Sequence, residues 1–393
     1  MRMSRPLPLS SAEAKRLILS AQGLAGASPF GKGKEGALKA IEHLGYVQLD
    51  TLAVVARAHH HTLWARNASY KETHLDQLLR EKKIFEYWSH AASYLPLRDY
   101  RFSLPRKMDY QSGRAHWFKK DKRMMQYVLD RIRAEGALQA RDFENDRPRG
   151  SWFDWKPAKR ALEQLFLDGS LMVAARNGFQ KVYDLAERVL PPGTDVSVPT
   201  AAELARYLAQ TALRAQGLVS APEAAYMRSN MQGPVKKALR ELAEENVAAE
   251  VRIEGVEETY FASKEMLHAK TRIKKEVRLL SPFDNSVIQR KRLVRMFGYD
   301  FQIECYLPEH KRRFGYFCLP ILYGDQFVGR LDPKADRAKK IFYVKSLHLE
   351  HPVKDVAHFE SQLEKALEEF ARFNGCEKVV LDKKARGMLR KKL

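Results

Sequence analysis

Cysteine is scarce in this chain of 393 residues, which has Cys305, Cys318 and Cys376 and no others. Three thiols without close spacing predict neither a disulfide framework nor a zinc site, and they favour a reduced, cytosolic compartment. No run of about eighteen apolar residues occurs, and the N-terminal residues MRMSRPLPLSS contain no apolar signal segment. We therefore expect a cytoplasmic protein that has no membrane partner.

Motifs for metal-dependent or nucleotide-dependent chemistry are also missing. The chain has no P-loop, no H-E-x-x-H and no clustered metal carboxylates. We therefore expect no metal and no cofactor, and a nuclease or a ligase is disfavoured. The adjacent His59, His60 and His61 cannot all face one ion on a helix or a strand, so a polar or DNA-facing surface is the better prediction for them.

Acidic residues are outnumbered, with 48 acidic against 69 basic residues and a net charge of +21. Such a surplus attracts polyanions, of which nucleic acid is the commonest soluble one. Two basic clusters are candidates for phosphate contacts, although a solvated surface charge is an equal alternative for any one member. These candidate DNA-binding residues are Arg290, Lys291, Arg292, Lys311, Arg312 and Arg313.

Two segments of the chain repeat one plan, in which helices are followed by a β-hairpin. In the first copy Pro157 opens a helix that Gly169 closes, and two strands follow around Asn177-Gly178. In the second copy Pro234 opens the corresponding helix, and the hairpin turns at Glu254-Gly255. Helices followed by a hairpin predict winged-helix units.

The two ends of the chain differ in predicted secondary structure, with helices near the N-terminus and mainly strands towards the C-terminus. Helices are predicted over Ser11–Gln22, with Ser10 or Ser11 as cap and Glu13 in the first turn, and over Glu35–Leu44. YVQLD then reads as a short strand, so this region is a third, divergent winged-helix candidate. Towards the C-terminus, strand-like runs precede a final helix of about 361–374 and a basic tail; the runs are IECYLP, GYFCLPILY, FVGRLD and IFYVKSLHL.

These patterns predict a mixed α+β, helix-rich fold of tandem winged-helix (helix-turn-helix) units with a C-terminal β-rich domain. The expected domains are 1–118, 119–190 and 191–265 for the three winged helices, and 266–393 for the β-rich domain with its basic tail.

The tripeptide Gln48-Leu49-Asp50 carries the most specific chemistry. In a strand, Tyr46, Gln48 and Asp50 would share one face, while Val47 and Leu49 anchor the other. A carboxylate can stabilise an oxocarbenium-like sugar and take a proton from water, and an amide can position that water. Spacing alone favours a plainer interpretation, in which these are exposed residues at a strand end and Asp50 caps the next helix.

Longer segments of the chain supply a resemblance. The sequence is similar to bacterial winged-helix DNA glycosylases of the AlkZ/YcaQ family, whose motif is Q-hydrophobe-Q or, in the YcaQ-like branch, Q-hydrophobe-D. The resemblance covers nearly the whole chain, and it is carried by YVQLDTLAVVARAHHHTLWARNASY, FEYWSHAASYLP, WFDWKPAKRALEQLFLDGSLMV, NGFQKVYDLAERVLP, LLSPFDNSVIQRKR and YLPEHKRRFGYFCLPILYGDQFVGRLDPKADR.

The resemblance implies a monomeric, metal-free, monofunctional DNA glycosylase that acts in DNA repair and is nucleoid-associated when bound to DNA. Its substrate would be double-stranded DNA with N7-alkylated purines, including interstrand crosslinks that it unhooks after alkylation damage. Gln48 and Asp50 are the catalytic pair that it implies. The alternative is a winged-helix transcription regulator without enzymatic activity, which has the same fold and charge.

Further residues are weaker candidates. Tyr46, Tyr87 and Trp88 are predicted to line the pocket, although structural packing is the favoured alternative for Glu86–His90. Asp284 is predicted to cap a turn rather than to face DNA. Nothing in the sequence marks a lysine as buried or as lowered in pKa, so attack on the sugar by a lysine is not expected.

Overall fold

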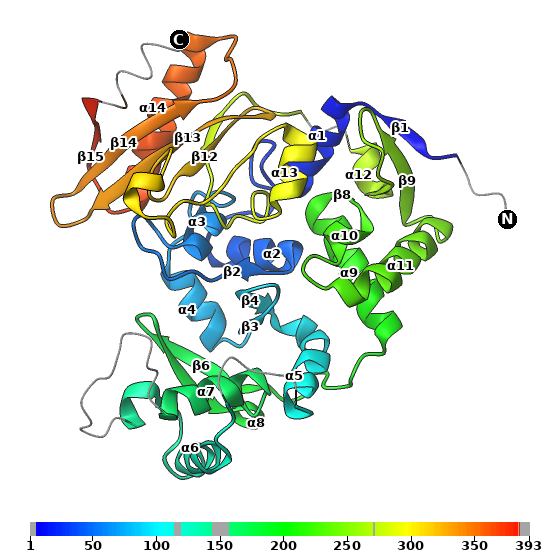
Figure 1. Cartoon of the computed structure of the whole chain (residues 1–393), viewed down its shortest axis with the longest axis vertical. Helices are drawn as coiled ribbons and strands as arrows, with labels where there is room; N and C mark the ends of the chain where they lie inside the picture. Colours follow the sequence, from blue (N-terminus) through cyan, green and yellow to red (C-terminus); the bar gives the residue numbers. More distant parts are fainter. Residues whose placement is uncertain (1–4, 114–118, 144–156, 270–271, 384, 386–393) are drawn as a thin grey trace. The chain divides into compact units, whose positions relative to one another are not determined.

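The computed structural model describes residues 5–113, 119–143, 157–269, 272–383 and 385. The chain divides into two compact units (Figure 1). Unit 1 comprises Met1–Tyr70 and Ala205–Leu393, and unit 2 comprises Lys71–Leu204. The predicted basic tail beyond residue 385 lies outside the described residues. Among the described helices, none has the length and apolar character that a membrane crossing requires.

The N-terminal part of unit 1 has the predicted helices. Strand β1 (Leu7–Leu9) leads into α1 (Ser11–Ala21), where Ser10 and Glu13 form a capping box that satisfies N–H groups of the first turn. Helix α2 (Gly33–Leu44) follows and begins two residues before the predicted start at Glu35. The chain then continues through β2 (Val47–Gln48) to α3 (Ala58–Trp64).

The second predicted repeat also lies mainly in unit 1. Its elements are α9 (Ala201–Gln216), β8 (Leu218–Val219), α10 (Ala221–Ala224), η3 (Ser229–Met231), α11 (Gln232–Glu244), β9 (Ala248–Ile253), β10 (Tyr260–Ser263) and α12 (Lys264–His268). The strands are ordered β1-β9-β10-β8, and β1 adds to the hairpin in parallel. The β9–β10 hairpin includes the predicted turn at Glu254-Gly255, but its loop is longer than two residues.

The C-terminal part of unit 1 is the predicted β-rich region. A five-stranded sheet has the order β11 (Val277–Leu279), β12 (Leu319–Tyr323), β13 (Gln326–Asp336), β14 (Ile341–Leu349) and β15 (Lys378–Leu381). Helix α14 (Val356–Phe373) packs on this sheet (Figure 1). It buries Phe359, Leu363 and Phe370. Two short helices, α13 (Arg290–Phe297) and η4 (Glu309–Lys311), lie between β11 and β12 in the sequence.

Unit 2 contains the first repeat. Helix α4 (Thr73–Arg80), the hairpin β3 (Ile84–Trp88) and β4 (Ala92–Pro96), η1 (Leu97–Ser103) and α5 (Leu104–Gln111) come first. The repeat itself comprises α6 (Lys122–Glu135), β5 (Leu138–Gln139), η2 (Ala140–Phe143), α7 (Pro157–Leu167), β6 (Leu171–Asn177), β7 (Gln180–Leu185) and α8 (Ala186–Val189). The β6–β7 hairpin turns at Asn177-Gly178 as predicted, with Gly178 at a φ of 59°.

The mixed α+β class and the β-rich C-terminal region are confirmed. The two repeats also agree with each other, because in each the short strand pairs with the second strand of the hairpin (β5 with β7, β8 with β10). Two predictions are wrong in detail. IECYLP forms a loop and no strand, and the last helix begins at Val356 rather than near 361. The winged-helix assignment and the division into four domains stay predictions.

Candidate active site

The segment that carries Gln48 and Asp50 leaves α2 through a left-handed turn. Gly45 has a φ of 78°, and its N–H donates to the Ile41 carbonyl (2.9 Å). A side chain at this position would also collide with the methyl group of Thr211. Glycine is therefore required both by the backbone and by the space. The turn directs Val47 into the core, where it is fully buried.

Strand β2 ends at Gln48, so the predicted extended stretch is only two residues long and strand alternation does not reach Asp50. Gln48 and Leu49 are 8% and 7% exposed. Asp50 is partly buried in the irregular segment that follows, and its Oδ1 accepts a hydrogen bond from the Leu52 N–H (2.7 Å). Asp50 therefore caps a local turn, and not the next helix, because α3 begins only at Ala58.

The second oxygen of Asp50 is available for chemistry. In the part of the chain that the structure describes, Oδ2 accepts no hydrogen bond. Burial raises the pKa of this carboxyl group, and the Leu52 N–H and the Arg57 charge oppose that rise. A carboxylate with a raised pKa is a stronger proton acceptor than an exposed one. Asp50 thus has one oxygen that is held in place and one that can receive a proton.

Sequence reasoning did not place Cys305 and Tyr306 beside Asp50. The negative charge of Asp50 adds to burial in raising the pKa of the Cys305 thiol and of the Tyr306 phenol. Ile303, in the same loop, and Leu52 pack against the same hydrophobic core. No sequence signal connects residues so far apart, since their approach depends on how the C-terminal sheet folds against the N-terminal helices of unit 1.

The segment after Asp50 is held by the C-terminal part of unit 1. The Ala335 N–H on β13 donates to the Val54 carbonyl (3.0 Å). The Ala56 N–H donates to Oδ1 of Asn374, the residue that ends α14 (2.6 Å). These bonds link 54–56 to two C-terminal elements, so the position of Asp50 depends on both.

A buried ion pair supports the other end of the segment. Asp284 and Arg66 have fully buried side chains and form two hydrogen bonds of 2.6 and 2.9 Å. Burial opposes ionisation of Asp284, but the Arg66 charge outweighs it and holds the pKa of the carboxyl group below its usual range. Asn285, the next residue, donates its amide N–H to the Tyr46 carbonyl (3.1 Å). The pair therefore fixes the loop of Asp284 and Asn285, which holds the backbone at Tyr46, two residues before Gln48.

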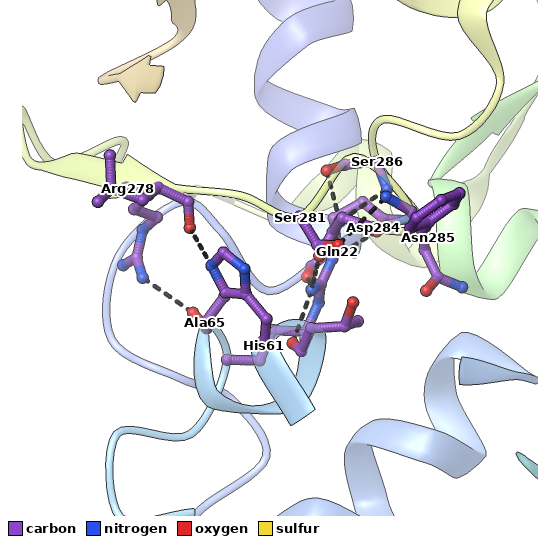
Figure 2. Close-up of polar contacts among 12 residues, drawn as sticks. Gln22, His61, Ala65, Arg278, Ser281, Asp284, Asn285 and Ser286 are labelled. Atoms are coloured by element: carbon purple, nitrogen blue, oxygen red, sulfur yellow. Dashed lines mark hydrogen bonds and ion pairs between the residues drawn. The ribbon is translucent and has the colours of Figure 1, made fainter. Parts of the chain in front are cut away.

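The predicted turn capping by Asp284 is confirmed, because Oδ1 accepts from the N–H and the hydroxyl of Ser286 at 2.9 and 2.6 Å (Figure 2). Its partner Arg66 was not predicted. Arg66 also donates to the carbonyl and the side chain of Gln22, which lies at the end of α1. The ion pair therefore joins α1, the residues after α3 and the 281–286 loop into one polar network in the core.

The prediction of a histidine surface is wrong for two of the three histidines. His59 is 3% exposed and His61 is fully buried. Nε2 of His61 lies 2.8 Å from the Leu279 carbonyl (Figure 2), and burial lowers the pKa of His61 to about 4. His60 is partly buried and contacts the Tyr70 hydroxyl (2.7 Å). Within the described residues, no group of three or more His, Cys, Asp or Glu side chains could hold a metal ion.

The first basic cluster is mostly internal. Arg290 donates to the carbonyls of Val287 and Pro282 (2.7 and 2.6 Å), and burial lowers its pKa to about 10. Arg292 is 5% exposed and forms an ion pair with the buried Glu223. Lys291 is exposed. The structure therefore leaves Lys291 as the phosphate-binding candidate of this cluster and gives the two arginines structural roles.

The second basic cluster lies on the loop next to Asp50. Lys311 and Arg313 are exposed. Arg312 is partly buried and donates to the Leu307 carbonyl (2.9 Å). Their backbone is held by Glu304, whose carboxylate accepts N–H bonds from Arg313, Phe314 and Gly315 at 3.0, 2.8 and 3.1 Å. Two exposed cationic side chains, Lys311 and Arg313, therefore lie on the loop that contains Tyr306, with the Arg313 guanidinium 4.8 Å from the centre of the Phe314 ring.

The remaining pocket candidates belong to unit 2. Tyr87 is 2% exposed, and its hydroxyl donates to the Leu167 carbonyl (2.6 Å), so this ring has a packing role. Trp88 is partly buried beside the Arg106 guanidinium. Lys107 is 3% exposed, lies 3.9 Å from the centre of the Tyr100 ring, and has its pKa lowered to about 7 by burial. A buried lysine of lowered pKa therefore exists, although the sequence did not mark one.

Comparison with known proteins assigns the chain to a class. Residues 41–373 match the family model described as DNA glycosylase AlkZ-like. The chain therefore belongs to the AlkZ-like DNA glycosylase family, whose members act on DNA in repair. Among solved structures it is similar to the Streptomyces sahachiroi DNA glycosylase AlkZ, with a TM-score of 0.64, 16% sequence identity, and coverage of 96% of this chain and 100% of that chain. At this identity the structural likeness supports the fold alone.

Proposed function

We propose that this protein is a monofunctional DNA glycosylase that hydrolyses the N-glycosidic bond of N7-alkylated purines and unhooks interstrand crosslinks made through such bases. The observation that carries the proposal is the hydrogen bonding and the raised pKa of the Asp50 carboxyl group. One carboxylate oxygen is fixed by the Leu52 N–H, the other has no hydrogen-bond partner in the described part of the chain, and burial raises the pKa of the group.

Asp50 would act on the water and on the sugar. As the bond between C1′ and the purine N9 lengthens, positive charge develops on the deoxyribose, and a carboxylate nearby stabilises it. The water oxygen then forms a bond to C1′, and one water proton passes to Asp50. Gln48 would orient this water through its amide, which has both a donor and an acceptor. The products are the free base and an abasic site.

The surroundings of Asp50 support the proposed substrate class. Of the described residues, the one whose charge alters the pKa of Asp50 is Arg57, and no second carboxyl group interacts with it. A neutral purine needs an acid to protonate it as it leaves. An N7-alkylated purine is already cationic and departs as a neutral molecule, so one carboxylate is sufficient. This chemistry supports N7-alkylated bases over undamaged ones.

The environment of Lys107 supports hydrolysis by water without strand cleavage. A bifunctional glycosylase attacks C1′ with an amine, which must be neutral and must reach the DNA. Lys107 has the lowered pKa, but its Nζ is buried and has no hydrogen-bond partner among the described residues. It cannot reach a sugar without unfolding its surroundings, so water is the better nucleophile.

The test is excision of N7-methylguanine, and unhooking of a nitrogen-mustard crosslink, from a labelled duplex in EDTA. We expect Asp50→Asn to slow release by about 10²–10⁴-fold, the usual range for a proton acceptor, while it still binds DNA. Gln48→Ala should also be slow. Asp300→Asn, which changes an exposed aspartate on another segment, should match the wild-type protein. The abasic product should remain uncut until it is heated in alkali.

Other outcomes separate the alternatives. Equal release by the wild-type protein, Asp50→Asn and Gln48→Ala would show that the protein is a glycosylase but that Gln48 and Asp50 are not its catalytic residues. Release of N7-methylguanine without unhooking would restrict the proposed substrate to single adducts. No release from any substrate, together with tight binding to one defined duplex sequence, would favour a transcription regulator.

A further inference from the structure

Two exposed apolar side chains lie near the two ends of the catalytic segment. Met227 and Tyr306 are each 73% exposed, the highest values among the exposed large hydrophobic residues that the structure describes. Single apolar residues on a surface are common and need no explanation by themselves. These two are of interest because each lies on a short, firmly held loop that the structure links to residues 46–50.

Met227 is held in an unfavourable backbone conformation. Its φ is 57°, a left-handed value that costs a residue with a side chain on the order of 1 kcal/mol. The flanking backbone is fixed by the bond from the Arg228 N–H to the Ala225 carbonyl (2.8 Å). In this conformation the methionine side chain is exposed to solvent.

Hydrogen bonds connect Met227 to the start of the catalytic segment. The hydroxyl of the preceding Tyr226 donates to the Ile288 carbonyl (3.4 Å). Three residues earlier on that loop, Asn285 donates to the Tyr46 carbonyl (3.1 Å). Met227 is thus two hydrogen-bonded steps from Tyr46, and the buried Arg66–Asp284 pair keeps the intervening loop in place.

Tyr306 lies at the other end of the segment. The Leu307 N–H donates to the Glu304 carbonyl (2.9 Å), and Arg312 donates to the Leu307 carbonyl (2.9 Å). The Glu304 carboxylate closes the base of the loop by accepting three N–H bonds. The loop therefore holds Tyr306 out in solvent beside Asp50, with the exposed Lys311 and Arg313 close by in the sequence.

We propose that Tyr306 and Met227 contact DNA bases next to the lesion, with Tyr306 stacking on a base and Met227 acting as an apolar wedge in the base stack. This inference rests on the proposed function, because it takes the sugar at Asp50 as the point of attack. Aromatic side chains stack on any base, and apolar wedges open base steps in distorted duplexes. The exposed cations of the Tyr306 loop would hold the phosphates of the same strand.

Contacts of Tyr306 and Met227 with the bases would help Asp50 to reach the sugar. A duplex keeps C1′ of a stacked nucleotide away from side chains of the protein. Opening the stack at one step exposes the sugar to Asp50 without removing the base into a closed pocket. That geometry accepts a bulky or crosslinked base, which cannot be flipped freely.

The test measures unstacking separately from catalysis. In an Asp50→Asn background, a duplex with 2-aminopurine next to N7-methylguanine reports opening of the stack by increased fluorescence. We expect Tyr306→Ala to abolish most of the increase and to weaken binding of damaged relative to undamaged DNA by about 5- to 150-fold, the range for loss of one stacked base. Tyr306→Phe should retain both properties, and Met227→Ala should reduce the fluorescence increase. Val294→Ala, which shortens a side chain 45% exposed on α13, is the control.

The outcomes are distinct from those for the proposed function. If the wild-type protein excises the base and Tyr306→Ala leaves fluorescence and affinity unchanged, the inference is wrong and the proposed function stands. Equal losses in Tyr306→Phe and Tyr306→Ala would assign the effect to the hydroxyl and overturn stacking. If stack opening depends on Tyr306 but the wild-type protein excises no base, the contact between Tyr306 and DNA is supported and the proposed glycosylase activity is wrong. Each variant should melt at the wild-type temperature, because both side chains are exposed.

Discussion

The burial of Lys107 in unit 2 makes a quantitative prediction about stability. Its ammonium group has no hydrogen-bond partner among the described residues, and it lies 3.9 and 4.8 Å from the ring centres of Tyr100 and Tyr87. Burial lowers the pKa to about 7, whereas lysine in an unfolded chain has a pKa of about 10.4. The perturbation that we propose is Lys107→Met, which keeps the length of the side chain and removes the titration.

The sign follows from proton binding. Between pH 7 and pH 10 the unfolded chain binds a proton at Lys107 that the folded protein does not, so the free energy of unfolding rises with pH in this window. With the two pKa values given, the rise between pH 7 and pH 9 is about 2 kcal/mol. Lys107→Met lacks this contribution, and it should be more stable than the wild-type protein at pH 7, with the difference shrinking by about 2 kcal/mol at pH 9.

Urea unfolding of both proteins at a series of pH values, followed by tryptophan fluorescence, measures this difference. Other groups that titrate in the window, such as the three thiols, are common to the two proteins and cancel in the comparison. Aromatic faces attract an ammonium ion by about 1–2 kcal/mol and act against the lowered pKa. A stability difference that stays constant from pH 7 to pH 9 would show that the rings keep Lys107 charged, and it would refute the reasoning.

The remaining predictions concern unit 1. Because burial raises the pKa of Asp50, the rate of excision should fall as the pH drops through that raised pKa, which a pH–rate profile measures; a rate independent of pH would assign the carboxylate another role. Arg66→Ala should destabilise the protein by about 3–5 kcal/mol in urea unfolding, since it leaves a buried carboxylate unpaired. Gly45→Ala should cost more than about 1 kcal/mol, because the backbone is left-handed there and Thr211 fills the space. Replacing both Lys311 and Arg313 by Ala should reduce the slope of log affinity for DNA against log salt by about 2, one for each lost phosphate contact.

Local signals in the sequence predicted much of the fold. Ser10 and Glu13 predicted the capped start of α1, Asn177-Gly178 predicted a hairpin, and the run IFYVKSLHL is strand β14 from its first to its last residue. Each of these depends on contacts within a few residues. IECYLP failed because Glu304 uses its carboxylate to bind three backbone N–H groups of a loop, a pattern that strand propensity does not include.

The candidate site likewise contains residues that the sequence could predict and residues that it could not. Gln48 and Asp50 could be selected from the sequence because they are neighbours and because longer segments resemble a family. The distant residues that lie beside this segment or support it could not be selected in this way. Tyr306, whose pKa Asp50 raises, and the Arg66–Asp284 pair, which fixes the loop bonded to Tyr46, come from distant parts of the chain, and a buried ion pair gives no periodic pattern. The surface prediction for the histidines failed for a related reason. Three successive polar residues are usually exposed, but here distant parts of the chain bury His61.

The bonds that hold residues 54–56 have a consequence for the synthesis of the protein. The Val54 carbonyl needs Ala335, and the Ala56 N–H needs Asn374. A ribosome that has made the first fifty residues has therefore made the candidate pair Gln48 and Asp50 and the helix α2 before them, but neither of these two C-terminal supports. The nascent chain lacks these two bonds until α14 has emerged, so a polypeptide released early would carry Gln48 and Asp50 without the support that residues 54–56 receive. The candidate site therefore has all of these contacts only after α14 has been synthesised.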